Sequence, residues 1–161
     1  MKELAIISIV ILSGVIGYMQ KEKYIAEKNL LIYIKNFLLF YQLNIRVYNN
    51  DIVKIIDNYI IKHKNKSANY NNLFYKIKNI YQIDKNFLKE KIRNNLAFDL
   101  ISNHLEYIGE SDKPSEEERI KSTVDFIDEQ IKVVEKDIKQ KGDLWFKLSI
   151  AIGVAISIII W

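Results

Sequence analysis

The run from Leu4 to Met19 reads LAIISIVILSGVIGYM, and the run from Leu148 to Trp161 reads LSIAIGVAISIIIW. Neither run contains a charged residue, although 27% of the 161 residues are charged. A helix that spans a bilayer needs about 20 apolar residues, with about 17 as the lower limit. The second run can extend back across Lys147, because a lysine near a helix end can reach the membrane surface. We therefore predict transmembrane segments at residues 1–20 and 143–161.

Each apolar run has an alternative explanation. The first could be a cleaved signal peptide because it follows Lys2, but Glu3 weakens the positive leader and no clear small-residue cleavage site precedes Tyr18. The second could be a buried helix of a soluble protein. We favour a membrane anchor at both ends of the chain.

Basic residues lie almost entirely between the two apolar runs. Of the 24 Lys and Arg residues, only Lys2 is outside this middle segment. Cytoplasmic flanks of membrane helices carry such an excess of basic residues. We therefore predict two passes through the membrane, with residues 21–142 in the cytoplasm and both termini on the other side.

Small residues recur at intervals of four in both runs. Ser13 and Gly17 have this spacing in the first run, and Ser149, Gly153 and Ser157 have it in the second. Four-residue spacing places small side chains on one helix face, where another backbone can approach closely in lipid. Ser149, Gly153 and Ser157 are therefore the predicted packing residues of the C-terminal span.

Composition indicates a helical protein. With 49% hydrophobic residues the chain is too apolar to be disordered. Five glycines and one proline favour long helices over a turn-rich β-sandwich. The absence of cysteine excludes disulfides, thiolate zinc sites and cysteine nucleophiles.

The middle segment has apolar residues every three or four positions, which is typical of helices. Asn49–Asp51 offers N-cap side chains for the second helix, and Gly109 is expected at the C′ position that ends the fourth. A polar, basic loop is expected at 63–72. The four expected helices cover about 22–48, 52–62, 72–80 and 84–108.

The last helix is the clearest element in the sequence. Ser111 or Asp112 can cap it, and Pro114 suits its first turn. Its apolar seam, spaced as in a coiled coil, contains Ile120, Val124, Ile127, Ile131, Val134 and Ile138, and continues to Trp145, Leu148 and Ile152. We predict one helix that passes from the cytoplasm into lipid and can bend at Gly142. The predicted fold is an all-α, membrane-anchored antiparallel helical bundle.

No motif for catalysis, metal binding or phosphate binding is found, so we expect no enzyme activity, no cofactor and no small-molecule substrate. His63 and His104 are far apart and are expected in solvent. Glu116, Glu117 and Glu118 are expected to be exposed partners of the helix dipole. The basic residues are spread along helices and fit membrane orientation and anionic lipid better than nucleic acid.

Two short motifs resemble the stage III sporulation protein AB family of endospore-forming bacteria. The first is Ile108-Gly109-Glu110-Ser111-Asp112 followed by Glu116 and Ile120, where the family has Leu-Gly-x-x-Asp-x-x-x-Gln-x-x-x-Ile. The second, KGDLWFKL at 141–148, is similar to Lys-Gly-x-Leu-Tyr-x-x-Leu-Gly, with Trp145 for Tyr and Ser149 for the last Gly. The order of elements agrees along the whole chain.

The resemblance implies a scaffold role without enzymatic activity. It implies a cytoplasmic region similar to the F domains of the type II secretion platform, in the mother-cell membrane around the forespore. It also implies a channel complex with ring-forming proteins and a secretion-type ATPase, which would contact the turn at Ile108, Gly109, Ser111 and Asp112. The alternative is a two-span helical adaptor for general envelope or division assembly, which growing cells would need.

Overall fold

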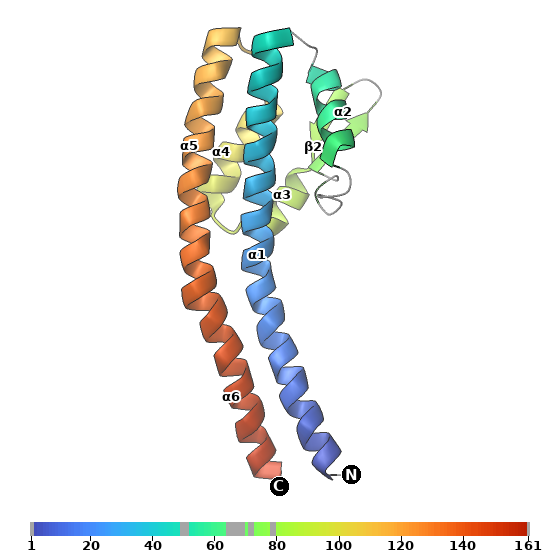
Figure 1. The fold of residues 1–161 in the computed structure, drawn as a ribbon, viewed down its shortest axis with the longest axis vertical. Coiled ribbons are helices and arrows are strands. Elements are labelled where there is room, and N and C mark those ends of the chain that lie inside the picture. The colour runs from blue at the N-terminus through green and yellow to red at the C-terminus, as the bar shows by residue number, and fades with distance from the viewer. Residues whose placement is uncertain (1, 49–51, 64–69, 71–72, 78–79, 161) are drawn as a thin grey trace. The chain divides into compact units, whose positions relative to one another are not determined.

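The structure is a computed structural model, and it describes all residues except 1, 49–51, 64–69, 71–72, 78–79 and 161 (Figure 1). The described residues form an all-α fold with one small β-hairpin, so the all-α part of the predicted fold class is confirmed, while the two-span membrane anchoring stays a prediction. The elements are α1 (Lys2–Tyr48), α2 (Ile52–His63), β1 (Phe74–Ile77), β2 (Ile80–Ile83), α3 (Lys85–Lys91), α4 (Asn95–Glu106), α5 (Lys113–Asp137), the π-helical turn η2 (Ile138–Gly142) and α6 (Asp143–Ile160).

The chain divides into two compact units. The first, which we call the two-helix unit, contains residues 1–28 and 132–161. The second, which we call the bundle unit, contains residues 29–131. Helices α1 and α5 contribute residues to both units.

In the two-helix unit, the first part of α1 runs antiparallel to α6, and both chain ends lie at the same end of the pair (Figure 1). Glycines mark the closest approaches. A Cβ added at Gly17 would lie 2.8 Å from Ser149 Cβ and 2.9 Å from Phe146 Cα. A Cβ added at Gly153 would lie 2.8 Å from Ser13 Cβ. At these points the backbones are too close for any side chain.

The predicted seam does not stay in phase through Gly142, and this expectation was wrong. Trp145 and Ile152, which it placed at the contact, are 51% and 57% exposed. Gly153, one residue after the predicted contact position Ile152, is buried instead, and so is Gly142. The cause is η2, because a π turn contains one residue more than an α turn and so shifts the facing side by one position.

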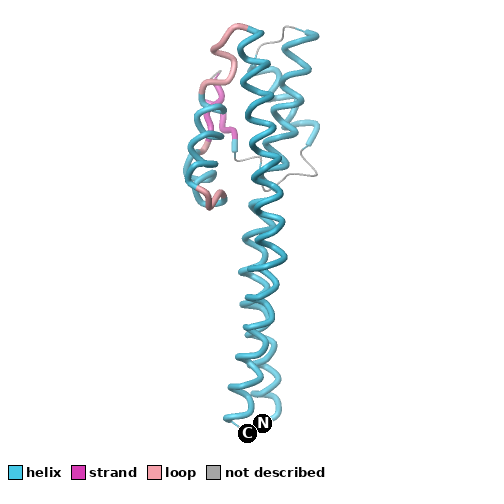
Figure 2. The backbone as a smooth tube through the Cα atoms, turned by 90° about the vertical axis from the view of Figure 1, so that its left-hand side faces the viewer, coloured by secondary structure: helices cyan, strands magenta, loops and turns pink. Residues whose placement is uncertain are grey.

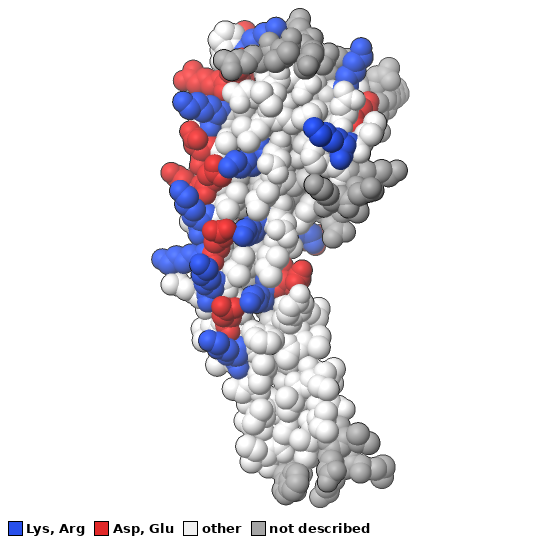
Figure 3. Space-filling model, in the orientation of Figure 1, with Lys and Arg blue, Asp and Glu red and all other residues white. Residues whose placement is uncertain are grey.

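The end of the two-helix unit that contains both chain termini presents an apolar surface. Residues 4–20 of α1 and 148–160 of α6 contain no charged residue, and the lower part of the face in Figure 3 carries no blue or red atoms. Exposed large apolar residues include Ile7, Ile11, Leu12, Val15 and Ile16 on α1 and Leu148, Ile152, Val154, Ile156 and Ile158 on α6.

By length and composition, one helical segment in the described part of the chain could cross a membrane, Lys113–Ile159. The structure therefore supports the expectation of an apolar C-terminal helix that could span a membrane. The N-terminal span stays a prediction.

The bundle unit is built around the second part of α1. Its core is formed by side chains that are almost fully buried: Leu30, Leu31, Ile34, Phe37 and Leu38 from α1, Ile55, Ile56 and Tyr59 from α2, Leu88 from α3, Ile101 from α4, and Ile120 and Ile127 from α5. Aromatic rings join α1 to α2 and β1, since the Phe37 centroid lies 5.3 Å from that of Tyr59 and 4.6 Å from that of Phe74. The hydroxyl of Tyr59 donates to the Tyr33 carbonyl at 3.0 Å.

The expected helix at 72–80 is wrong, because its described residues 74–77 and 80 lie in the strands of an antiparallel hairpin, and residues 72, 78 and 79 lie outside the described part. Strands β1 and β2 pair Phe74 with Ile83 and Ile77 with Ile80 (Figure 2). Both strands are short runs rich in aromatic and β-branched residues, which suit a strand. In runs this short, periodicity does not separate a strand from a buried helix.

The expected helix at 84–108 is also divided in two. Asp84 caps α3 by accepting from the Phe87 amide at 2.9 Å, and Asn94 caps α4 by accepting from the Leu96 amide at 3.0 Å. Between them Ile92 has extended backbone angles. Asn94, a residue type that favours the N-cap, was the sequence signal for this break, but the apolar periodicity continues across it. The caps expected at Asn49–Asp51 lie outside the described residues.

We expect Gly17→Ala to destabilise the two-helix unit and Gly14→Ala to leave it intact. The new methyl at 17 meets the Phe146 backbone, and overpacking of this kind costs about 1–3 kcal/mol. At 14 the nearest atom, Ile150 Cγ1, is 3.9 Å from the added Cβ, so helix propensity can even gain up to about 1 kcal/mol. Thermal unfolding in mild detergent, followed by circular dichroism, measures both; equal midpoints would contradict the close helix contact.

Candidate functional site

The turn between α4 and α5 contains the residues predicted to contact a partner. Ile108 is half-buried, whereas Gly109, Ser111 and Asp112 are exposed. Gly109 has a φ of 84°, a conformation that glycine adopts without strain. Helix α4 ends at Glu106 with Tyr107 as its C-cap, so Gly109 lies one residue beyond the C′ position expected for it.

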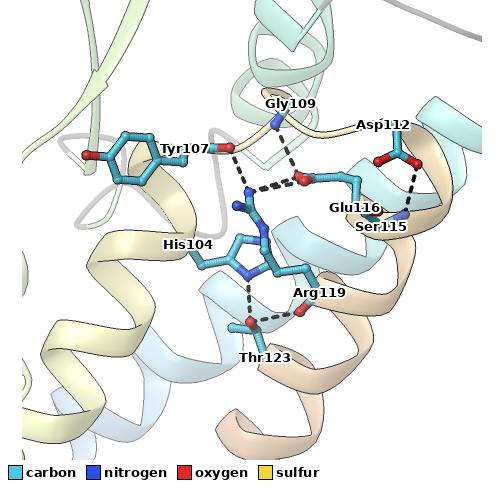
Figure 4. Close-up of polar contacts among 8 residues, drawn as sticks. All are labelled: His104, Tyr107, Gly109, Asp112, Ser115, Glu116, Arg119 and Thr123. Carbon is cyan, nitrogen blue, oxygen red and sulfur yellow. Dashed lines mark hydrogen bonds and ion pairs between the residues drawn. The ribbon is translucent and has the colours of Figure 1, made fainter.

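Glu116, which lies near the start of α5, binds the backbone of the turn between α4 and α5. Its side chain is 2% exposed, and its Oε1 accepts a hydrogen bond from the Gly109 amide at 3.1 Å (Figure 4). Its Oε2 lies 3.1 Å from Nη2 of Arg119. The expectation that Glu116 is a solvent-exposed dipole partner was wrong, because the turn folds back over the start of α5 and covers the carboxylate.

Arg119 holds the other end of the turn. Its Nη2 donates to the Tyr107 carbonyl at 2.7 Å while pairing with Glu116 (Figure 4). Two α5 side chains one helical turn apart therefore bind backbone groups at positions 107 and 109. Charge-assisted hydrogen bonds of this kind are stronger than neutral ones, so the turn has a fixed shape. We call Glu116 and Arg119 the turn clamp.

Asp112 begins α5 as its N-cap. Its carboxylate accepts from the Ser115 amide at 3.4 Å, its carbonyl accepts from the Glu116 amide at 2.9 Å, and the bonds from Ser115 lower the pKa of Asp112. Of the two caps that the sequence offered, the structure uses Asp112.

His104 lies behind the turn clamp and is 4% exposed. The Thr123 hydroxyl donates to the Arg119 carbonyl at 2.9 Å, so it accepts from His104 Nδ1, which is 2.5 Å away. Burial, with a smaller contribution from the charge of Arg119, lowers the pKa of His104 to about 4. The expectation of a solvated His104 was wrong, because it is on the side of α4 that faces α5.

An open groove of about 620 Å³ lies beside the turn clamp, lined by Leu100, Asn103, His104, Tyr107, Ser115, Glu118, Arg119, Ser122 and Thr123. Among these residues, Arg119 binds the Tyr107 carbonyl of the turn, and His104 and Thr123 bind each other. Within the residues that the structure describes, no group of three or more His, Asp or Glu side chains could hold a metal ion. The arrangement suits presentation of a rigid surface to a partner.

The predicted packing residues lie in the two-helix unit. Gly153 and Ser157 are buried and Ser149 is half-buried, on the side of α6 that faces α1. The Ser157 hydroxyl donates to the Gly153 carbonyl at 2.8 Å, so its polarity is satisfied within α6. The structure thus places the three residues on one helix face; their role in a membrane stays a prediction.

The charged pairs of α1 were not anticipated from the sequence. In the two-helix unit Lys21 lies 2.7 Å from Asp143 and Lys28 lies 2.8 Å from Glu135. In the bundle unit Lys35 lies 2.5 Å from Asp128. The three lysines are seven residues apart, and this heptad spacing was the signal that could have found them.

The family model for stage III sporulation protein AB matches residues 2–161. No curated protein and no solved structure matches the chain. The resemblance drawn from residues 108–120 and 141–149 is therefore confirmed at the level of the family. The similarity to type II secretion F domains stays a prediction.

We expect Glu116→Gln to be tolerated and Glu116→Ala to destabilise the bundle unit. A Gln side chain keeps an oxygen for the Gly109 amide, and the family pattern has Gln at this position. Ala leaves Gly109 and Arg119 without that acceptor, at a cost of about 1–3 kcal/mol. Thermal unfolding of the purified chain measures the difference. The exposed Glu118→Ala serves as control and should change stability by about 0.5 kcal/mol or less.

Stability should fall more steeply with acid in the wild type than in His104→Gln. The pKa of His104 is about 4 when folded and 6.5 as a free side chain, so the unfolded chain binds the extra proton first. Stability from the neutral ring is present above pH 6.5 and is lost as the pH falls towards 4. Between these values the free energy of unfolding should drop by about 1 kcal/mol per pH unit more in the wild type. Equal slopes for wild type and His104→Gln would refute the assignment.

Proposed function

The chain belongs to the stage III sporulation protein AB family, and we propose that it is a membrane scaffold in the channel complex between mother cell and forespore. Family membership implies a role in stage III of sporulation. The scaffold role, without enzymatic activity, is our proposal for what the chain does in that stage.

Membrane insertion through both helices of the two-helix unit is supported by its surface. Residues 4–20 and 148–161 contain no charged residue, and most of the large apolar side chains that the structure describes there are exposed. Tyr18 and Trp145 are exposed and lie within three residues of the Lys21–Asp143 pair. Aromatic and basic residues of this kind gather at membrane interfaces. We infer that the membrane surface lies at this level, with residues 21–142 in the mother-cell cytoplasm.

Binding of a secretion-type ATPase is the proposed task of the turn at Ile108–Asp112. The turn clamp fixes its backbone before any partner arrives, and the polar residues Glu110, Ser111 and Asp112 are exposed. A surface that is already ordered loses little conformational entropy when a partner binds, so less of the binding free energy is offset. The fixed, exposed turn is the single observation that favours a scaffold within the family role.

A strain that lacks the gene should complete engulfment and then fail to form heat-resistant spores. A plasmid copy with Ser122→Cys should restore spore yield, because Ser122 is exposed on α5 and lies outside the turn at Ile108–Asp112. The native chain has no cysteine, so this thiol is the only one that a maleimide can label. We expect labelling only after the mother-cell cytoplasm is opened.

Three results would contradict the proposal. Normal spore yield without the gene, in a genome with no second copy, removes the sporulation scaffold. A defect in vegetative growth favours the two-span envelope or division adaptor. Labelling of Ser122→Cys in intact cells reverses the proposed orientation.

A further inference from the structure

One outer face of the C-terminal helices carries a row of exposed lysines. They follow one another at steps of four, three and eight, and they are Lys132, Lys136, Lys139 and Lys147. The step of eight crosses η2, and one α turn of about 3.6 residues and one π turn of about one residue more together take about eight. The four side chains therefore share one face, which we call the lysine row. Gly142 and Gly153 are buried where the same helices face α1.

The acidic residues of this region are engaged with other groups. Residues 21–28 and 132–147 contain eight lysines and five acidic residues, which gives a net charge of +3. Three ion pairs of 2.7–2.9 Å join carboxylates to lysines outside the row: Lys21–Asp143, Lys28–Glu135 and Lys141–Asp137. The other two carboxylates are on α1, where Glu22 interacts with a tyrosine hydroxyl and Glu27 is buried. The unbalanced positive charge therefore lies on the lysine row and on Lys23, which is exposed on α1.

Lys139 and Lys147 lie on either side of the membrane surface proposed above. That surface is at the level of Asp143, and each of the two lysines is four residues from Asp143, about 6 Å along the helix. A lysine stem is long and flexible, so both ammonium groups can reach this level. Lys136 and Lys132 are about 10 and 16 Å from it, which is at or beyond the screening length of about 8–10 Å.

We propose that Lys139 and Lys147 bind the phosphate of an anionic phospholipid in the cytoplasmic leaflet. This inference rests on the proposed insertion of the two-helix unit into the membrane. The charge is complementary, because Asp143 between the two lysines is already paired with Lys21. Leu148, directly after Lys147, begins an uncharged stretch with exposed apolar side chains, so acyl chains can pack against α6 while the headgroup stays at the lysines. An acidic protein segment would use the lysines and leave this apolar continuation uncovered, so a lipid fits better.

Trp145 can report which lipid occupies the site, because it lies between Asp143 and Lys147 and is 51% exposed. Trp161→Phe leaves it as the only tryptophan of the full chain. This parent chain is reconstituted in phosphatidylcholine vesicles in which a rising share of the lipid is dibrominated phosphatidylcholine or dibrominated phosphatidylglycerol. Bromine quenches tryptophan fluorescence only at close range, so quenching measures how often each lipid lies at Trp145. At low salt we expect an apparent affinity at least about fivefold higher for phosphatidylglycerol, since each lysine near an anionic surface contributes about this factor.

Removing both charges should abolish the preference. In the chain with Lys139→Gln and Lys147→Gln, the ratio of the two affinities should fall below about twofold. The matched control combines Lys121→Gln with Lys132→Gln, which removes the same charge from exposed positions of α5 that are farther from the membrane surface. The control should keep the ratio of the parent chain.

Two kinds of failure are distinguishable. Equal quenching by both lipids in the parent chain would overturn the lipid site and favour an acidic protein segment as the partner of the lysine row. A ratio unchanged by Lys139→Gln with Lys147→Gln, or lowered as much in the control, would overturn the assignment to these two lysines. In each of these cases membrane insertion stands, because Trp145 is still quenched. Absence of quenching by either lipid would instead contradict the proposed insertion itself.

Discussion

In both units, α1 lies antiparallel to a helix from the C-terminal part of the chain, and the other contacts depend on this pairing. Between Lys21 and Lys28, α1 advances seven residues, while the facing chain advances eight from Glu135 to Asp143. The extra residue is accommodated by η2. Ion pairs this exposed add little stability, so close packing at Gly17 and Gly153 must hold the two helices together. The ion pairs instead favour one alignment of the two helices along each other.

The bundle unit also contains elements that are too short to be stable alone. Helices α2, α3 and α4 and the β-hairpin have at most twelve residues each, and they bury their apolar sides around Phe37 and its neighbours. The turn from α4 to α5 then closes over Glu116 and Arg119. A buried carboxylate is tolerated there because it accepts a backbone amide and pairs with a guanidinium. The same closure leaves the outer face of α4 exposed.

Errors in the expectations drawn from the sequence have two physical causes. Periodicity counts residues at a constant 3.6 per turn, so it cannot include the π turn that moves the contact from Ile152 to Gly153. Residue type gives an average environment, so Glu116 and His104 were assigned to solvent, where such residues are most often found. Their partners are a backbone amide seven positions earlier and a hydroxyl nineteen positions later, which only the fold brings near.

The sequence by itself determined the long helices, the apolar ends, a cap at Ser111 or Asp112, the face shared by Ser149, Gly153 and Ser157, and the family. Each of these follows from local propensity or from a period along one helix. Tertiary structure alone decided the β-hairpin, the break at Ile92, the shift at η2 and the turn clamp. These features depend on which segments meet in space. For each of them, the competing local conformations have similar free energies, so only packing of the helices favours one over the other.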